Sequence, residues 1–377
     1  MNIVTTYDSY DPSRFYLRYK IISELRLVSR YWNHVIVSSP RLWQRIAIDV
    51  LSTSSRFPPA YVVRMWIDRT CGIRDLEILI SMPRKSSIVY SAHAKAIMNV
   101  LKPEMHRSRE LWYFSEAGLL DFPQNLSKAY NLTKLSISAG IIDEDAIRTI
   151  GPALHSLPGV IRDLDIETLD FDGLFLFGKC YPMRWDHLER LTLRYEGWMQ
   201  GILNILSDVR TSLISADIHA EGQWSCSFQY HTLVPYIQTI SFAAIRYLIL
   251  WIYDANVDLF EHLEMGSLEV IELTVNWRPI PERARNIAPL VNFIVSRSPS
   301  LQTCTMKFNG SPFDWSAMAF CHPEVMRLQT YLFYNIELEN VMRYAIIGSR
   351  NVFTRIRLIH EDDNPSCLTI GWHENGN

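Results

Sequence analysis

The sequence predicts an α/β solenoid with one parallel β-sheet, outer helices and a small helical segment at its N-terminal end. Two observations predict this fold: a short apolar template recurs along most of the chain, and helix-like segments lie between its copies. The length agrees with this fold, because 377 residues are too many for one ordinary compact core. The 48% hydrophobic and 20% charged side chains are the balance of a folded protein. The same composition excludes disorder as the dominant state.

The template is an apolar residue, a second three positions later, and a third two positions after that. Copies begin at Ile73, Leu132, Ile161, Leu188, Leu213, Ile237, Leu268, Leu301, Leu328 and Phe353. From Leu132 onward, consecutive copies begin 24 to 33 residues apart. A weaker copy begins at Ser108, and an alternative phase at Ile245 leaves the middle of the chain ambiguous.

Side chains two positions apart lie on one face of a strand, so the last two template positions indicate a short strand with one apolar face. The first position is expected to pack inside the preceding turn. One copy buries too few side chains to offset the entropy lost on ordering it. Stacked copies bury a continuous core, so the copies are expected to stack.

Four segments between the strands carry helix signals: residues 143–157, 199–209, 281–296 and 337–347. The first opens with acidic residues and closes before Pro158-Gly159, and the last ends before Gly348. Strand followed by helix at this period resembles irregular leucine-rich repeats, although the usual Asn or Cys after the last leucine is mostly absent. The alternative is that the same strands belong to ordinary α/β domains.

The N-terminal segment carries the most specific motif. Residues 25–48 read LRLVSRYWNHVIVSSPRLWQRIAI. Helical spacing predicts one apolar stripe that ends at Ser38-Ser39-Pro40, followed by a short turn that Ser39 can cap. The stripe and the turn contain Leu27, Val28, Tyr31, Trp32, Val35, Ile36, Pro40, Leu42 and Trp43.

This run resembles the second half of an F-box, whose pattern is roughly V-C-R-x-W-R-x-hydrophobic-A-x-x-P-x-L-W. The matching residues are Val28, Arg30, Trp32, Val35, Pro40, Leu42 and Trp43. Residues 61–80 resemble the segment that follows the F-box in the fungal F-box/leucine-rich-repeat family. That match consists of Trp66, Arg69, Thr70, Gly72 and Leu76, with Asp75 in place of the usual proline.

The resemblance implies a Skp-type adaptor and a cullin as partners. It also implies that the protein is the substrate-recognition subunit of an SCF-type ubiquitin ligase, with an unknown protein substrate on the repeats. An F-box begins with a leucine-proline-x-glutamate phrase, and nothing before Leu25 supplies it. Either the chain is an incomplete version of a longer one, or the F-box is degenerate. In the second case the helical segment serves only as a cap on a leucine-rich-repeat scaffold.

The expected domains are a partial F-box-like segment at 1–50, a connecting segment with the first irregular repeats at 51–120, a repeat array at 121–362 and a tail at 363–377. In each strand, the side chains beside the apolar positions project onto an exposed concave face, where a target protein would bind. The candidates on this face are Lys134, Ser136, Arg190, Thr192, Arg194, Glu272, Thr274 and Arg357.

No phosphate-loop, dinucleotide-binding, zinc-protease or nucleophile-elbow motif occurs, and the eleven histidines are scattered. We therefore expect no catalytic residue, no cofactor and no metal site, unless a pocket gathers residues that are distant in sequence. The net charge of −3 argues against partners such as nucleic acid or an anionic membrane. With no signal-peptide pattern and six widely spaced cysteines, the chain is expected in the cytoplasm or nucleus.

Overall fold

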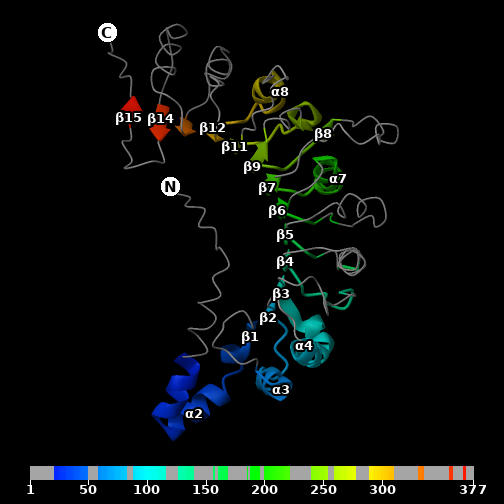
Figure 1. Ribbon diagram of the computed structural model, residues 1–377, viewed down its shortest axis with the longest axis vertical. Helices are drawn as coiled ribbons and strands as arrows, with labels where there is room; N and C mark the ends of the chain where they lie inside the picture. The colour runs from blue at the N-terminus through cyan, green and yellow to red at the C-terminus, as the bar shows by residue number, and fades with distance from the viewer. Residues whose placement is uncertain are drawn as a thin grey trace. The chain divides into compact units, whose positions relative to one another are not determined.

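A computed structural model of the protein describes residues 21–49, 58–82, 88–115, 126–139, 156–157, 160–168, 185, 187–195, 199–220, 239–253, 259–276, 288–309, 330–334, 356–359 and 368–370. The chain divides into two compact units, Met1–Ile161 and Arg162–Asn377. Within each unit, strands follow one another in a parallel sheet, with helices in the connections between them (Figure 1). None of the described helices has both the length and the apolar composition required to span a bilayer.

The described part of the first unit starts with helical residues 21–28, α2 (Arg30–Val37) and the 3₁₀ turn η1 (Pro40–Trp43). The elements that follow are β1 (Arg45–Asp49), α3 (Ala60–Arg69), β2 (Leu76–Met82), α4 (Ile88–Leu101), η2 (Lys102–Arg107), β3 (Ser108–Ser115) and β4 (Lys134–Ala139). The four strands pair in chain order, and every pairing is parallel.

The second unit contains β5 (Asp163–Thr168), β6 (Arg190–Tyr195), α7 (Met199–Val209), β7 (Ser215–Ala220), β8 (Ile240–Ser241), β9 (Tyr247–Tyr253), β10 (Leu263–Glu264), β11 (Val270–Asn276), α8 (Ala288–Asn292), the π-helical turn η5 (Phe293–Arg297), β12 (Thr303–Asn309), β13 (Thr330–Tyr334), β14 (Ile356–Ile359) and β15 (Leu368–Ile370). Its main sheet runs β5-β6-β7-β9-β11-β12-β13-β14-β15, parallel except for the β14–β15 pair. Strands β8 and β10 form a separate two-stranded parallel sheet.

Strand register brings equivalent template positions together, which confirms the predicted apolar face. In the first unit one buried row contains Ile46, Ile78, Leu111 and Leu135, and the next contains Ile48, Ile80, Tyr113 and Ile137. In the second unit the corresponding buried rows contain Leu164, Leu191, Ala216, Leu248, Ile271 and Cys304, and Ile166, Leu193, Ile218, Leu250 and Leu273. Each row is a continuous line of side chains contributed by successive repeats.

The first template position closes a turn, as predicted. The backbone N–H of Leu188 donates to the carbonyl of Trp185 at 2.9 Å, and that of Leu301 donates to Ser298 at 3.1 Å. Leu132 and Leu268 make the same bond three residues back, at 2.9 and 3.1 Å. All four leucines are buried. One template copy is therefore one turn and one strand.

The copy predicted at Ile237 was assigned to the wrong sheet. Its apolar residues Ile240 and Phe242 are buried, but Ile240 pairs with Leu263 in the small sheet. The main-sheet strand is β9, which corresponds to the alternative phase at Ile245. Both stretches satisfy the template, but only one strand can pair between β7 and β11, and that strand is β9. The other lies on the helix side, where α7 contacts β8 and η5 contacts β10.

Strand β1 was missed, because its residues fall inside the segment assigned to the helical motif. Trp43, Ile46 and Ile48 nevertheless have the template spacing, and all three are buried. The weaker copy at Ser108 is also a full strand, β3. Ser108 occupies its first position, and nearby Met105 supplies buried apolar volume.

The helix predicted at 199–209 is confirmed as α7, with Ile202, Leu206 and Val209 buried. For the segment at 281–296, the described part is helical from Ala288 and ends one residue beyond the prediction, at Arg297. The helix predicted at 337–347, and all but the last two residues of that at 143–157, lie outside the described residues.

Gly72 lies in the turn between α3 and β2, with φ of 80°. A Cβ added there meets no atom within 4 Å, so the cost of Gly72→Ala comes from the left-handed backbone alone. We expect it to lower the free energy of unfolding by about 1 kcal/mol, measured by urea denaturation. Gly266→Ala is the matched control, because it has equal space and no left-handed backbone. It should change stability by less than about 0.5 kcal/mol, and equal losses would contradict the argument.

Candidate interaction surfaces

Ser29 divides the predicted N-terminal helix into two. Its backbone is extended, with φ of −162° and ψ of 163°, and its Oγ accepts a hydrogen bond from the N–H of Trp32 at 3.1 Å. Ser29 is therefore the N-cap of α2. At the other end, the Ser39 hydroxyl donates to the carbonyl of Val35 at 2.6 Å. Ser39 consequently ties η1 back to α2, instead of capping η1 with its side chain as predicted.

Part of the predicted apolar stripe is buried and fastens the helical segment to the repeats. Ile22, Ile36 and Trp43 form a small core. Leu42 of η1 and Trp66 of α3 pack against this core. The indole Nε1–H of Trp43 donates to the carbonyl of Ile36 at 2.9 Å. These contacts join the helical segment to the first helix of the repeats.

The rest of the stripe predicted for adaptor binding or capping is exposed, and the break at Ser29 divides it between two helical segments. Leu27 is 87% exposed, Val28 65%, Tyr31 71% and Trp32 43%. Of the α2 residues, only Ile36, near η1, is covered by the small core. The break at Ser29 separates α2 from the preceding helical residues 21–28. Val35 and Pro40 are half-buried.

Two further exposed side chains, Ile21 at 45% and Leu25 at 37%, extend the same segment. They are four residues apart in a helix and so lie on one face, a signal that was missed because the motif was read from Leu25 onward. We name the set the N-terminal apolar surface, which consists of Ile21, Leu25, Leu27, Val28, Tyr31 and Trp32. The rings of Tyr31 and Trp32 meet edge to face, with centroids 6.1 Å apart.

A second candidate surface is the strand face, the side of each sheet opposite the apolar rows. In the second unit, strand register forms one row of Asp165, Thr192, Asp217, Ile249 and Glu272. Every second strand thus contributes a carboxylate, and adjacent strands lie about 4.8 Å apart. Although Glu272 is exposed by its accessible surface, partial desolvation by the surrounding protein raises the pKa of its carboxyl, and the negative charge of Asp217 raises it further.

The predicted target-binding residues differ in how accessible they are. Arg190 is exposed and forms a bidentate ion pair with Asp163, at 2.5 and 2.7 Å, which raises the pKa of Arg190. Lys134 lies over the ring of Trp112, 5.4 Å from its centroid. Glu272 is exposed, whereas Thr192 and Arg194 are half-buried.

Exposure was predicted wrongly for Ser136 and Thr274, which are 2% and 7% exposed. Register places Ser136 beside Trp112 and Thr274 beside Trp251. A short side chain next to an indole on the neighbouring strand is readily shielded from solvent. Arg357 lies in β14 opposite Leu332, and its side chain is outside the described part of the structure.

The described residues show little that could support covalent or metal chemistry. No group of three or more His, Cys, Asp or Glu side chains among them could hold a metal ion. Burial raises the pKa of Cys304 to about 12, so this thiol stays protonated at neutral pH. Nε2 of His219 lies 3.0 Å from Oδ1 of Asp217, and the imidazole stacks on Trp251 with centroids 4.7 Å apart. The His219–Trp251 stack extends the strand face beside the acidic row.

No family model matches the chain, and no curated protein matches it. Among solved structures, it is similar to the leucine-rich repeat-containing protein LegL7 from Legionella pneumophila. The two share 12% sequence identity over 71% of this chain and 88% of that chain, with a TM-score of 0.33. The leucine-rich-repeat-like character of this α/β fold is established by its own strand pairing and template register.

The two tryptophans of the helical segment provide a matched stability test. Trp43→Phe removes a buried hydrogen bond to Ile36 and part of the small core, so it should lower the free energy of unfolding by about 1 to 2 kcal/mol. Trp32→Phe, at an exposed position, should change it by less than about 0.5 kcal/mol. Urea denaturation followed by circular dichroism measures both. A larger loss for Trp32 would contradict the assignment of buried and exposed halves.

The acidic row predicts a pH-dependent gain in stability for Glu272→Gln. The folded-state pKa of Glu272 is raised above its ordinary value of 4.5, so the ionised carboxylate destabilises the fold above that pKa, and the effect is lost as the pH falls toward 4.5. The variant should therefore unfold at higher urea than wild type near pH 7, and at the same urea near pH 4. In an Asp217→Asn background the gain should be smaller, because one of the two causes is removed. A gain independent of pH would refute the coupling.

Proposed function

We propose that the protein is a non-catalytic interaction module that holds two proteins together. The observation that carries the proposal is the N-terminal apolar surface, six large apolar side chains exposed on a short folded helical segment. Exposed apolar surface of this kind is typical of a binding site, because leaving it in water is unfavourable. The strand face of the second unit would bind the second protein, through exposed charged side chains such as Arg190 and Glu272.

In its more specific form, the proposal is that the protein is the substrate-recognition subunit of an SCF-type cullin-RING ubiquitin ligase. A Skp-type adaptor would dock on the N-terminal apolar surface. The F-box-like motif supports this, since its residues Val28 and Trp32 are exposed and available to a partner. The protein would contribute no catalytic group. It would act by raising the effective concentration of a target near the enzyme that transfers ubiquitin.

The second candidate is a leucine-rich-repeat scaffold whose helical segment is only an N-terminal cap. The packing of Ile36 and Trp43 against Trp66 favours it, because these contacts cover part of the first repeat. The scaffold function predicts stable partners without a Skp-type adaptor. It also predicts that partner abundance stays unchanged when proteasomes are inhibited, whereas a ligase subunit would cause its target to accumulate.

Capture of a purified Skp-type adaptor and cullin by the full chain tests the ligase function. Wild type should retain both, and Tyr31→Ala should weaken capture at least about tenfold, because exposed aromatic anchors carry much of the binding energy of an interface. Tyr130→Ala is the matched control, since Tyr130 is similarly exposed, at 59% against 71%, but lies outside the N-terminal apolar surface. No capture by a folded wild-type chain, or equal losses in both variants, would refute adaptor docking on this surface.

A further inference from the structure

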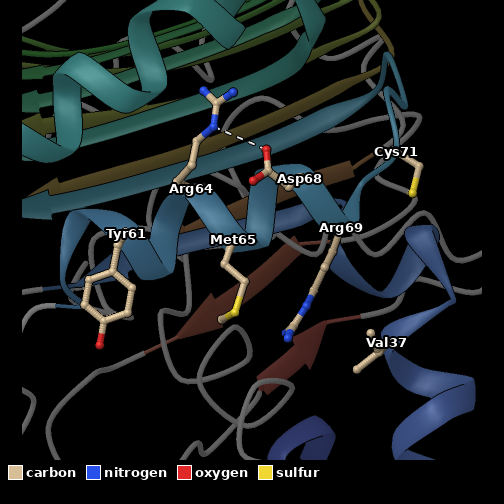
Figure 2. A pocket seen from close by; sticks show the side chains of 7 residues that line it. All are labelled: Val37, Tyr61, Arg64, Met65, Asp68, Arg69 and Cys71. Atoms are coloured by element: carbon tan, nitrogen blue, oxygen red, sulfur yellow. Dashed lines mark ion pairs between the residues drawn. The ribbon is translucent and has the colours of Figure 1, made fainter.

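A shallow cavity of about 460 Å³, largely open to solvent, lies between α3 and the end of α2 (Figure 2). Tyr61, Met65 and Arg69 extend from the same face of α3, spaced four residues apart, and Val37 closes the side formed by α2. The size is in the range of pockets that bind ligands or partner side chains. Its walls combine apolar surface from Val37 and Met65 with two guanidinium groups, of Arg64 and Arg69, and the carboxylate of Asp68.

Arg69 has no counter-ion among the described residues. Its guanidinium carbon lies 4.4 Å from the ring centroid of Trp43, so an aromatic face fixes the side chain in place. Its Nη1 is buried and has no hydrogen-bond partner in the described part of the chain. Burial lowers the pKa of Arg69, and the nearby positive charge of Arg26 lowers it further. An anion beside this guanidinium would remove an unfavourable arrangement of charge.

The other charges around the cavity are already compensated. Nε of Arg64 lies 3.2 Å from Oδ1 of Asp68, and Nη1 of Arg64 lies 3.7 Å from Oε1 of Glu104. Figure 2 shows Arg64 and Asp68 paired with each other on the side of α3 away from the Arg69 guanidinium. Arg69 is therefore the cation that this cavity offers to an incoming ligand.

We propose that this cavity is a docking site for an acidic segment of a partner protein, with one Asp or Glu carboxylate bound to the Arg69 guanidinium and a neighbouring apolar side chain against Met65 and Val37. A carboxylate and a guanidinium form charge-assisted, often bidentate hydrogen bonds, which fix both position and direction. The proposal extends the proposed function, because it gives a chemical class to one partner of the first unit.

A single carboxylate fits this cavity better than a polyanion. Nucleic acid and anionic membranes require several cations together, whereas the described cavity offers Arg69 with Arg26 nearby and a compensated Arg64. The apolar wall also suits a peptide, because a peptide can carry an apolar side chain next to an acidic one.

The test uses random peptides displayed on phage, selected on the full chain and depleted on the Arg69→Gln variant. Recovered peptides should be enriched in Asp or Glu next to an apolar residue. Synthetic versions, measured by fluorescence anisotropy, should bind Arg69→Gln about tenfold more weakly than wild type. Arg74→Gln is the matched control, because Arg74 is exposed nearby and does not line the cavity, and its binding should be unchanged.

A second variant covers the case in which Arg69→Gln fails to fold. Met65→Glu places a carboxylate one helical turn before Arg69, a spacing that favours an ion pair and preserves the helix. This internal carboxylate should compete with the peptides and weaken their binding about tenfold, while circular dichroism stays that of wild type.

Three results would overturn the proposal: peptides without acidic enrichment, equal binding by Arg69→Gln and Arg74→Gln, or binding of phosphatidylserine vesicles instead of acidic peptides. The outcome is separable from adaptor capture, which depends on Tyr31. Failure of the peptide test with adaptor capture intact would refute the cavity proposal alone. Peptide binding without adaptor capture would refute the ligase function alone.

Discussion

Strand register is the constraint on which the rest of this fold depends. Each strand pairs with its neighbour so that the same two template positions meet, as when Leu191 pairs with Ala216 and Ala216 with Leu248. If a strand shifted by one residue relative to its neighbour, its apolar side chains would lie on the opposite face of the sheet and would no longer fill the core. The turn closed by the first template position, such as Leu188 or Leu301, fixes where each strand begins and therefore its register. The charged order of the strand face, including the Asp165–Asp217–Glu272 row, follows directly from that alignment.

Trp43 connects the helical segment to the repeats because it belongs to both. It ends the F-box-like run, and it also stands at the first template position ahead of Ile46 and Ile48 of β1. Its ring is buried in the small core with Ile36, and the Arg69 guanidinium lies over it. The same residue thus anchors α2, begins the first strand and positions the cation of the cavity. Capping and partner binding are consequently compatible functions of neighbouring residues in this segment.

The sequence was sufficient for most strands of the main sheet and insufficient for the exposure of individual side chains. The apolar template located β2 to β7 and β11 to β14, because burial of alternate side chains imposes a period that survives without other similarity. It could not choose between the phases at Ile237 and Ile245, since both bury their apolar residues and only pairing with β7 decides. Periodicity likewise grouped Val28, Trp32 and Ile36 in one apolar stripe, but only tertiary packing determines that Ile36 alone among them is covered. The sequence placed Arg69 in the motif that follows the F-box-like run, but it could not show that its guanidinium has no counter-ion among the described residues. That property depends on three-dimensional packing.

Net charge and local charge lead to different conclusions about partners. A chain at −3 has no basic excess for a polyanion, and this argument concerns the sum of charges only. Among the described residues, particular charged groups have no oppositely charged partner: Arg69 beside Trp43 in the first unit, and Glu272, which the nearby Asp217 repels, in the second. Such groups discriminate between partners, because an incorrect charge at a partly buried site is costly and a correct one relieves an existing repulsion. In the proposed interaction module, selectivity would therefore arise from a few charges held in place by the repeat packing, with the N-terminal apolar surface supplying most of the affinity.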